Sequence, residues 1–298
     1  MTERGLTVPA DVRYADVGDS RFAFREHGVG EPVVFVHGSI SDLTVWDSQL
    51  EVTGERFRAI SYSRRYAWPN SDLPRGSMDR MQPHVDDLLA FLRAVDAEPA
   101  HLVGNSWGAF ISLRLAMQHP DSVCSLVLEE PPLVPLVVGA PPSPAHIVRS
   151  VLRRPRLTLT TLRFAASTIA PMSKLAKTDQ ITASIDRFAV GVLGQSVFEK
   201  LPAEMRAHMY ANANTHIGQA LAEGGFEPLT EMQIAAVATP TLVVVGQNSP
   251  VVLRELAALL TELLPDSRRV DIPDASHVMH LQNPSAVNHQ LLTFLSDP

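Results

Sequence analysis

Cysteine is almost absent from this chain of 298 residues, which contains a single one, Cys124. An internal disulfide is therefore excluded, and zinc clusters or redox chemistry that need several thiols are not expected. Cys124 stands at the start of an apolar strand pattern, and we expect it to be a small buried hydrophobic residue.

Long apolar runs and blocks of like charge are also missing. No apolar run approaches the roughly 18 residues of a membrane span, and residues 1–14 lack the basic-then-apolar layout of a signal peptide. The net charge is -7, so the chain lacks the excess of basic residues that is typical of proteins that bind nucleic acid. We therefore expect a cytoplasmic protein, a monomer or homodimer, that acts on a small molecule and has no nucleic-acid or membrane partner.

The hydrophobic residues, 45% of the chain, are arranged in two kinds of strand pattern. RFAFRE at 21–26 alternates polar and apolar positions, which is typical of a half-exposed antiparallel strand. Four later runs, VVFV at 33–36, LV at 102–103, LVL at 126–128 and LVVV at 242–245, are continuously apolar, as in parallel strands covered on both faces. Helical patterns at 84–95 and 107–118 separate them, so the sequence predicts an α/β fold with a doubly wound, mostly parallel sheet.

Residues 132–230 interrupt this alternation. The segment begins with a proline-rich stretch, contains helical patterns, and has no convincing strand before Thr241. We interpret it as a helical cap inserted into a core formed by residues 1–131 and 231–298. Residues 131–178 contain seven Lys and Arg side chains and no Asp or Glu, which we interpret as a solvated face, with Pro155 breaking a helix.

Polar clusters follow four of the buried strands, where the carboxyl ends of parallel strands would bring them to one crevice. The sharpest cluster is GNSWG at 104–108. A serine on a tight strand-to-helix turn needs small residues two positions to either side, because a Cβ atom there would collide with the backbone. An apolar strand before the motif and an apolar helix after it are the context that this turn requires, and they single out Ser106 as a nucleophile.

The chain resembles the α/β-hydrolase fold family over almost its whole length. The matching stretches are VVFVHGS at 33–39, GNSWG at 104–108, the helical insertion, and IPDASHVMHLQNP at 272–284. The resemblance implies that the histidine of a catalytic triad comes last in the chain, on a loop after the final strand. His277 occupies this position as general base, and His280 is the reserve candidate.

The same resemblance implies an oxyanion hole formed by the backbone N–H groups of Ser39 and Trp107. We place His37, Gly38, Arg64 and Leu133 as candidates for the wall of a substrate pocket. The His37 imidazole is better explained as a hydrogen-bonding support for its turn than as a proton carrier. Arg64 and the adjacent Arg65 are likewise better explained as residues that hold a loop in place than as substrate contacts.

The acid of the triad is missing from the position where most of the family carries it. Residues 246–250 after the seventh strand read GQNSP, and Glu255 lies inside a helical pattern where a solvated face explains it. Some subgroups of the family carry the acid after the sixth strand, which corresponds to Glu130 here. Strand alternation directs Glu129 to the opposite side, and we expect Pro131 to hold Glu130 in extended backbone.

These residues predict a serine hydrolase that cleaves carboxylic esters or lactones of medium-sized, largely apolar molecules. Ser106, His277 and Glu130 would form the triad, and no cofactor or metal is expected. Two alternatives stay open. The same triad could serve carbon–carbon bond hydrolysis or perhydrolysis, because fold and triad do not fix the substrate. The chain could also be a hydrolase-like ligand-binding protein without turnover.

Overall fold

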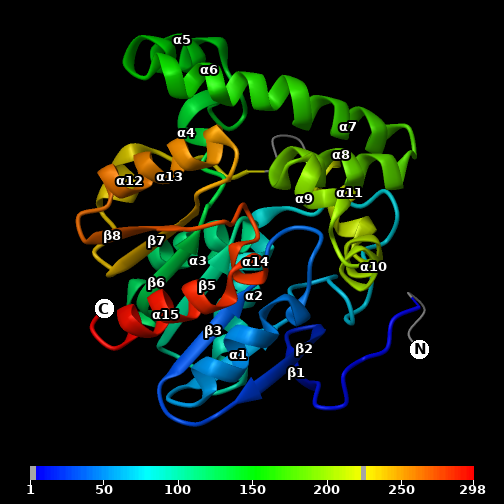
Figure 1. Cartoon of the computed structure of the whole chain (residues 1–298), viewed down its shortest axis with the longest axis vertical. Helices are drawn as coiled ribbons and strands as arrows, with labels where there is room; N and C mark the ends of the chain where they lie inside the picture. The colour runs from blue at the N-terminus through cyan, green and yellow to red at the C-terminus, as the bar shows by residue number, and fades with distance from the viewer. Residues whose placement is uncertain (1–4, 223–225) are drawn as a thin grey trace.

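An eight-stranded sheet forms the centre of the computed structural model, which describes residues 5–222 and 226–298 (Figure 1). The strand order is β1-β2-β4-β3-β5-β6-β7-β8. The strands β1 and β2 are antiparallel to each other, β2 is antiparallel to β4, and all the other neighbouring pairs are parallel. The strands span Arg13–Val17 (β1), Ser20–His27 (β2), Pro32–Val36 (β3), Arg58–Tyr62 (β4), Ala100–Asn105 (β5), Val123–Glu129 (β6), Thr241–Gly246 (β7) and Ser267–Ile272 (β8). The predicted doubly wound sheet is confirmed, including the antiparallel strand around residues 21–26.

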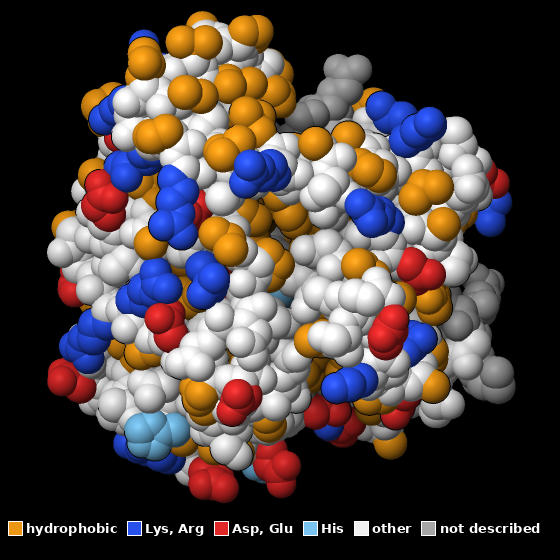
Figure 2. All heavy atoms as spheres, turned by 45° about the horizontal axis from the view of Figure 1, so that its top comes forward, with side chains coloured by type: hydrophobic (Ala, Val, Ile, Leu, Met, Phe, Trp, Pro, Cys, Tyr) orange, Lys and Arg blue, Asp and Glu red, His pale blue; other side chains and the backbone are white. Residues whose placement is uncertain are grey.

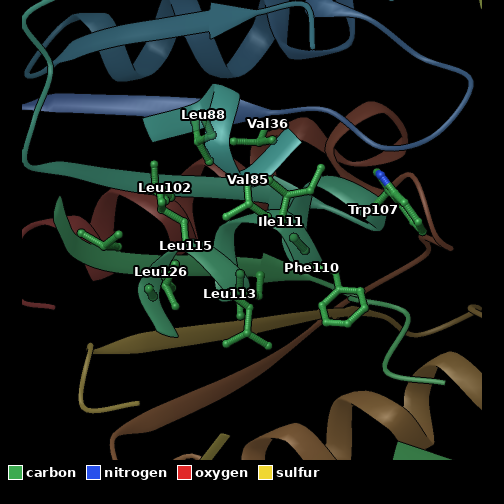
Figure 3. Close-up of a cluster of buried hydrophobic side chains, with 14 of the residues drawn as sticks. Val36, Val85, Leu88, Leu102, Trp107, Phe110, Ile111, Leu113, Leu115 and Leu126 are labelled. Carbon is green, nitrogen blue, oxygen red and sulfur yellow. The ribbon is translucent and has the colours of Figure 1, made fainter. Parts of the chain in front are cut away.

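Helices cover both faces of the sheet, which explains why the central strands are continuously apolar. In β3, Val34 and Val36 pack into one core cluster, while Val33 and Phe35 pack into the other. The first cluster is completed by α2 (Met81–Ala94), α3 (Trp107–Gln118) and α13 (Val251–Leu263), and Figure 3 shows part of it. The second is completed by α1 (Asp47–Gly54) and α15 (Pro284–Leu295). Short helical turns at Leu43–Trp46 (η1), Pro120–Ser122 (η2) and Met279–Gln282 (α14) connect these layers.

A series of helices connects β6 to β7, across the carboxyl ends of the parallel strands (Figure 1). They are α4 (Pro135–Val138), α5 (Pro144–Arg153), α6 (Pro155–Phe164), the π-helical η3 (Ala165–Ile169), α7 (Ala170–Lys177), α8 (Ile181–Leu193), α9 (Gln195–Glu199), α10 (Ala203–Ala211), α11 (Ala213–Leu221) and α12 (Glu231–Ala235). Pro155 begins α6, as the sequence indicated. The division into a core of residues 1–131 and 231–298 and a cap of residues 132–230 stays a prediction.

The cap has a small apolar cluster of its own that reaches the core. Ile185, Ala189 and Met209 pack there, and Ile40 joins them from the loop after β3. Ile40 directly follows the predicted oxyanion turn, so the turn is packed against the apolar cluster of the cap.

Cys124 is exposed, so the expectation that it is buried is wrong. It is the second residue of β6, where the pairing with β5 shifts register between Ala100 and His101. Strand alternation at this irregular end turns the thiol outward, although the residues after it are buried.

Within residues 5–222 and 226–298, no helix is both long enough and apolar enough to cross a membrane.

Replacement of Gly108 by Ala should strongly destabilise the fold, because a Cβ atom there would lie 2.1 Å from the backbone oxygen of Val36. Overpacking of this kind costs about 3 kcal/mol when backbone atoms must move. The free energy of unfolding in urea measures the loss.

Gly191→Ala is the matched control, because Gly191 is also helical but its added Cβ would meet the side chain of Thr168 rather than backbone. A smaller loss is expected for Gly191→Ala. Equal losses in the two variants would contradict the backbone contact as the cause.

Candidate active site

Ser106 occupies the turn between β5 and α3 in a backbone conformation that residues other than glycine rarely adopt. Its φ is 51° and its ψ is -116°. Its N–H donates a hydrogen bond to the Glu129 carbonyl oxygen at 2.8 Å, which anchors the turn to β6. Strained backbone of this kind persists where the surrounding structure fixes it.

The two glycines of the motif allow this turn to approach its neighbours. A Cβ atom on Gly104 would lie 2.6 Å from the backbone nitrogen of Ala109. The equivalent atom on Gly108 would collide with β3. The spacing G-x-S-x-G is therefore explained by steric contacts on both sides of Ser106.

Glu130 and His277 form the hydrogen bond that the sequence predicted. Nδ1 of His277 lies 2.7 Å from Oε2 of Glu130, although 147 residues separate the two in the chain. The other carboxylate oxygen of Glu130 accepts a hydrogen bond from the Gly246 N–H at 2.9 Å. Glu130 is 0% exposed and His277 is buried. This geometry orients the ring of His277, while the catalytic role of the pair stays a prediction.

The backbone of Glu130 is not extended, contrary to our expectation from Pro131. Its φ is 46°. The N–H of Glu130 donates to the Val244 carbonyl at 3.3 Å, and its carboxylate also reaches β7 through Gly246. These two contacts to β7 hold Glu130 at a positive φ, against the extended backbone that a following proline favours.

The loop after β7 carries no carboxylate at the expected position. Gln247 and Asn248 are exposed, and their N–H groups donate to the carbonyls of Ile272 and Ala275. The loop thus supports the segment that carries His277 through its backbone alone. Glu255 instead forms an ion pair with Arg156 at 2.6 Å, on the side of helix α6.

A second glutamate–histidine pair lies next to the first and was not recognised from the sequence. Oε2 of Glu129 is 2.6 Å from Nδ1 of His280. Asn105 connects the two pairs, because its Nδ2 donates to Glu129 at 3.2 Å and to the His277 carbonyl at 3.0 Å. The only signal in the sequence was the presence of two adjacent glutamates and of two histidines three residues apart, which would allow two pairs.

His280 is also held from its other side. Its ring is stacked on that of Trp46, with ring centroids 4.3 Å apart and planes 29° from parallel. Glu129 and Glu130 contact different histidines, but β6 ends at Glu129 and Glu130 has a positive φ, so strand alternation is not what separates them. His280 is therefore occupied by a partner other than Glu130.

The predicted oxyanion turn lies directly against the nucleophile. A Cβ atom on Gly38 would stand 3.3 Å from the Cβ atom of Ser106 and 2.8 Å from Oδ1 of Asn105. Trp107 is the first residue of α3, where a backbone N–H has no acceptor within the helix. Gly38 therefore lies against Ser106, and Ser39 lines the same cavity as Ser106.

A chain of hydrogen bonds connects the Ser39 side chain to the cap. Ser39 Oγ donates to Oε1 of Gln219 on α11 at 2.8 Å, and Gln219 Nε2 donates to Asp79 at 3.0 Å. Asp79 in turn accepts from His84 Nε2 at 2.7 Å. Burial would raise the pKa of Asp79, but the facing His84 and Arg64 lower it.

Arg64 stabilises the predicted oxyanion turn through hydrogen bonds to its backbone. Its guanidinium donates to the carbonyls of His37 at 3.0 Å and Gly38 at 2.8 Å, and its backbone N–H donates to Nε2 of His37 at 2.9 Å. Burial, followed by the charge of Arg64, holds the pKa of His37 well below its ordinary value. His37 is therefore neutral, with Nδ1–H donating to the Gly38 carbonyl at 2.8 Å.

A cavity of about 390 Å³ opens beside Ser106, between the core loops and the cap. Ser39, Ser106 and His277 all line it. The cap contributes a mostly apolar wall: Phe188, Ala189, Val192, Leu193, Leu201, Pro202, Met205 and Met209.

Four residues that the sequence placed in a possible substrate pocket, His37, Gly38, Arg64 and Leu133, are absent from the lining of this cavity. All four are buried. His37 and Arg64 are directed into the hydrogen-bond network beneath the turn, and Leu133 packs into the main core cluster. Arg65 does not line the cavity either and forms an ion pair with Asp87.

The cavity also has a polar patch on its cap side. Nδ1 of His208 lies 2.8 Å from Oδ2 of Asp42, which also accepts a hydrogen bond from Asn212 at 3.0 Å. Burial disfavours the charged imidazole, but the hydrogen bond and charge of Asp42 outweigh it and raise the pKa of His208. This hydrogen bond connects the loop after β3 to helix α10.

Comparison with known proteins agrees with this geometry. A family described as "alpha/beta hydrolase fold" matches residues 31–284. The chain therefore belongs to the α/β-hydrolase fold family. The protein named "Putative carbamate hydrolase RutD" from Azorhizobium caulinodans is 25% identical over 287 residues, covering 95% of this chain and 98% of that protein.

Two solved structures have the same fold. A thermophilic esterase from Thermogutta terrifontis has a TM-score of 0.72 and 22% identity, covering 96% of this chain and 98% of that chain. The enol-lactonase from Burkholderia xenovorans LB400 also has a TM-score of 0.72, with 17% identity, covering 96% of this chain and 100% of that one. At these identities the similarity establishes the fold alone.

Arg64→Met should lower stability more than Arg65→Met does. The first change removes the guanidinium donor of the buried His37 carbonyl and one of several donors to the Gly38 carbonyl, and an unsatisfied buried group costs about 1–3 kcal/mol. The second breaks a partly exposed ion pair with Asp87. Urea denaturation followed by circular dichroism gives both values, and an equal or reversed order would contradict the supporting role of Arg64.

Proposed function

We propose that this protein is a serine hydrolase that cleaves a carboxylic ester or lactone of a medium-sized, largely apolar substrate. The observation that carries the proposal is the 2.7 Å hydrogen bond between Glu130 and His277, in a cavity that Ser106 also lines. A buried carboxylate, an imidazole and a serine on a strained turn are the parts from which such a site is built.

In the proposed reaction Ser106 Oγ attacks the substrate carbonyl carbon while His277 Nε2 accepts its proton. Glu130 keeps the His277 proton on Nδ1 and stabilises the imidazolium that forms. The N–H groups of Ser39 and Trp107 stabilise the oxyanion. The imidazolium then protonates the leaving oxygen, and a water activated by His277 hydrolyses the acyl-enzyme. No step requires a cofactor or metal.

The charge of the cavity favours a neutral substrate. Among the described residues, no Lys or Arg lines it, whereas Asp47 and Glu204 do. Two polar residues of the lining already have partners within the protein: His208 is hydrogen-bonded to Asp42, and Asp47 forms an ion pair with Arg25. An anionic substrate would meet unfavourable charge at this wall. A neutral ester or lactone with an apolar acyl group fits the lining of α8 and α10 better.

Glu130→Gln should lower kcat/KM about a thousandfold to ten-thousandfold, because an amide cannot hold the correct tautomer of His277. Glu129→Gln is the matched control: the two glutamates are adjacent and equally buried, but Glu129 pairs with His280. Steady-state kinetics on a p-nitrophenyl ester, with circular dichroism to check folding, compares the two. Equal losses in both variants would contradict Glu130 as the acid.

A fluorophosphonate probe should label the wild-type protein covalently and should not label Ser106→Ala. Failure to label the wild type would favour the ligand-binding alternative, in which no nucleophile is activated. A panel of neutral esters, lactones and oxo acids, assayed with and without hydrogen peroxide, then separates ester cleavage from carbon–carbon bond hydrolysis and perhydrolysis. Turnover of oxo acids alone would contradict the proposed substrate class.

A further inference from the structure

The helical hairpin formed by α5 and α6 buries polar side chains between its helices and exposes several large apolar ones. Ser150 Oγ and Thr158 Oγ1 are 2.8 Å apart between the two helices, and both residues are buried. Five large apolar residues on the same helices are exposed, and we call them the apolar hairpin face: Val148, Val151, Leu152, Leu159 and Leu162. Leu157 and Ile147 pack against the core, so these five residues form a second apolar surface that faces away from it.

The apolar hairpin face is a cluster of exposed apolar side chains rather than a set of isolated ones. Leu152 is 80% exposed and Val148 is 59% exposed. Its five members lie within residues 148–162, while the other exposed large apolar residues of the described chain are spread from Tyr14 to Val251. Figure 2 shows orange side chains gathered at the top of the molecule, over these helices. Contiguous exposed apolar surface marks a site of interaction.

Cationic side chains border this face. Arg149 is next to Val148 and Arg163 is next to Leu162, and both arginines are exposed. Neither forms an ion pair within residues 5–222 and 226–298. Lys174 and Lys177 on α7 are also exposed, and no acidic residue occurs in the sequence from 131 to 178. Blue side chains accordingly lie beside and below the orange ones in Figure 2.

We propose that the apolar hairpin face binds the surface of a bilayer that contains anionic lipids. An interfacial helix pair of this kind inserts its apolar side chains at the acyl boundary, while its arginines contact lipid phosphates. The net charge of the whole chain is -7, so an anionic surface repels the rest of the molecule and favours approach through this edge. The proposal is independent of the proposed hydrolase function.

A second copy of the chain fits this face less well. In a symmetric dimer the same patch meets itself, which would bring Arg149 and Arg163 close to their own copies without intervening acids. The sequence led us to expect no membrane partner, but that expectation rested on the absence of membrane-spanning runs. Contact with a bilayer surface needs only an exposed amphipathic element.

Sedimentation of the full-length protein with lipid vesicles tests the proposal. The protein should sediment with phosphatidylcholine vesicles that contain phosphatidylglycerol, much less with pure phosphatidylcholine, and less again at high salt. Leu152→Asp should weaken the partition about tenfold, since the burial of one leucine side chain is lost. Val29→Asp is the matched control, because Val29 is 83% exposed but lies in the turn between β2 and β3.

A second pair of variants tests the charges. Arg149→Gln/Arg163→Gln should weaken binding to the anionic vesicles, and Arg75→Gln/Arg80→Gln should not, because these exposed arginines lie outside the cap. Circular dichroism and the urea midpoint, compared between all variants, check that each is folded.

Three results would overturn the proposal: absence of sedimentation with anionic vesicles, equal weakening by Leu152→Asp and Val29→Asp, or equal weakening by the two arginine pairs. Light scattering that reveals a dimer abolished by Leu152→Asp, in a protein that does not bind vesicles, would assign the face to a second copy instead.

Discussion

The arrangement of the site depends on the place where β6 ends. Two adjacent carboxylates leave this strand, and each is paired with an imidazole from the segment after β8. A buried carboxylate without a partner would be costly, so each pair restrains the segment that carries both histidines. Asn105 adds a third connection, from the residue before the nucleophile to the His277 backbone. The position of the imidazole is therefore fixed by hydrogen bonds from two neighbouring strands.

Two residues with strained backbone lie at the same place. Ser106 and Glu130 both have positive φ, and each has an N–H that donates to the next strand: Ser106 to Glu129 and Glu130 to Val244. These hydrogen bonds run in one direction across the sheet, from β5 to β6 to β7. Two unfavourable conformations are thus maintained by the sheet itself, whose central strands are buried on both faces.

Much of the site could be predicted because its signals are local in the sequence. The G-x-S-x-G spacing reflects steric contacts of two glycines, and the missing acid after β7 directed attention to Glu130. The pairing of Glu129 with His280 could not be predicted, since it depends on how the segment after β8 places its two histidines against the end of β6. The pocket residues were also missed. The cavity lies between the cap and the loops, and helical patterns alone do not show which face of α8 or α10 borders it.

The backbone of Glu130 shows a different limit. Pro131 restricts the preceding residue, but the restriction leaves more than one conformation open, and hydrogen bonds to β7 select the less common one. A rule based on neighbouring residues cannot anticipate a choice made by a strand more than a hundred positions away.

The hydrogen bonds from Ser39 through Gln219 to Asp79 connect the loop after β3 to helix α11. A cap exchanged for one from a distant relative would lose the acceptor that Gln219 provides, even if it enclosed a cavity of the same shape. Grafting of foreign lids onto this scaffold therefore has to preserve one amide on α11, and libraries that diversify the lid can keep that position constant while they vary the apolar wall.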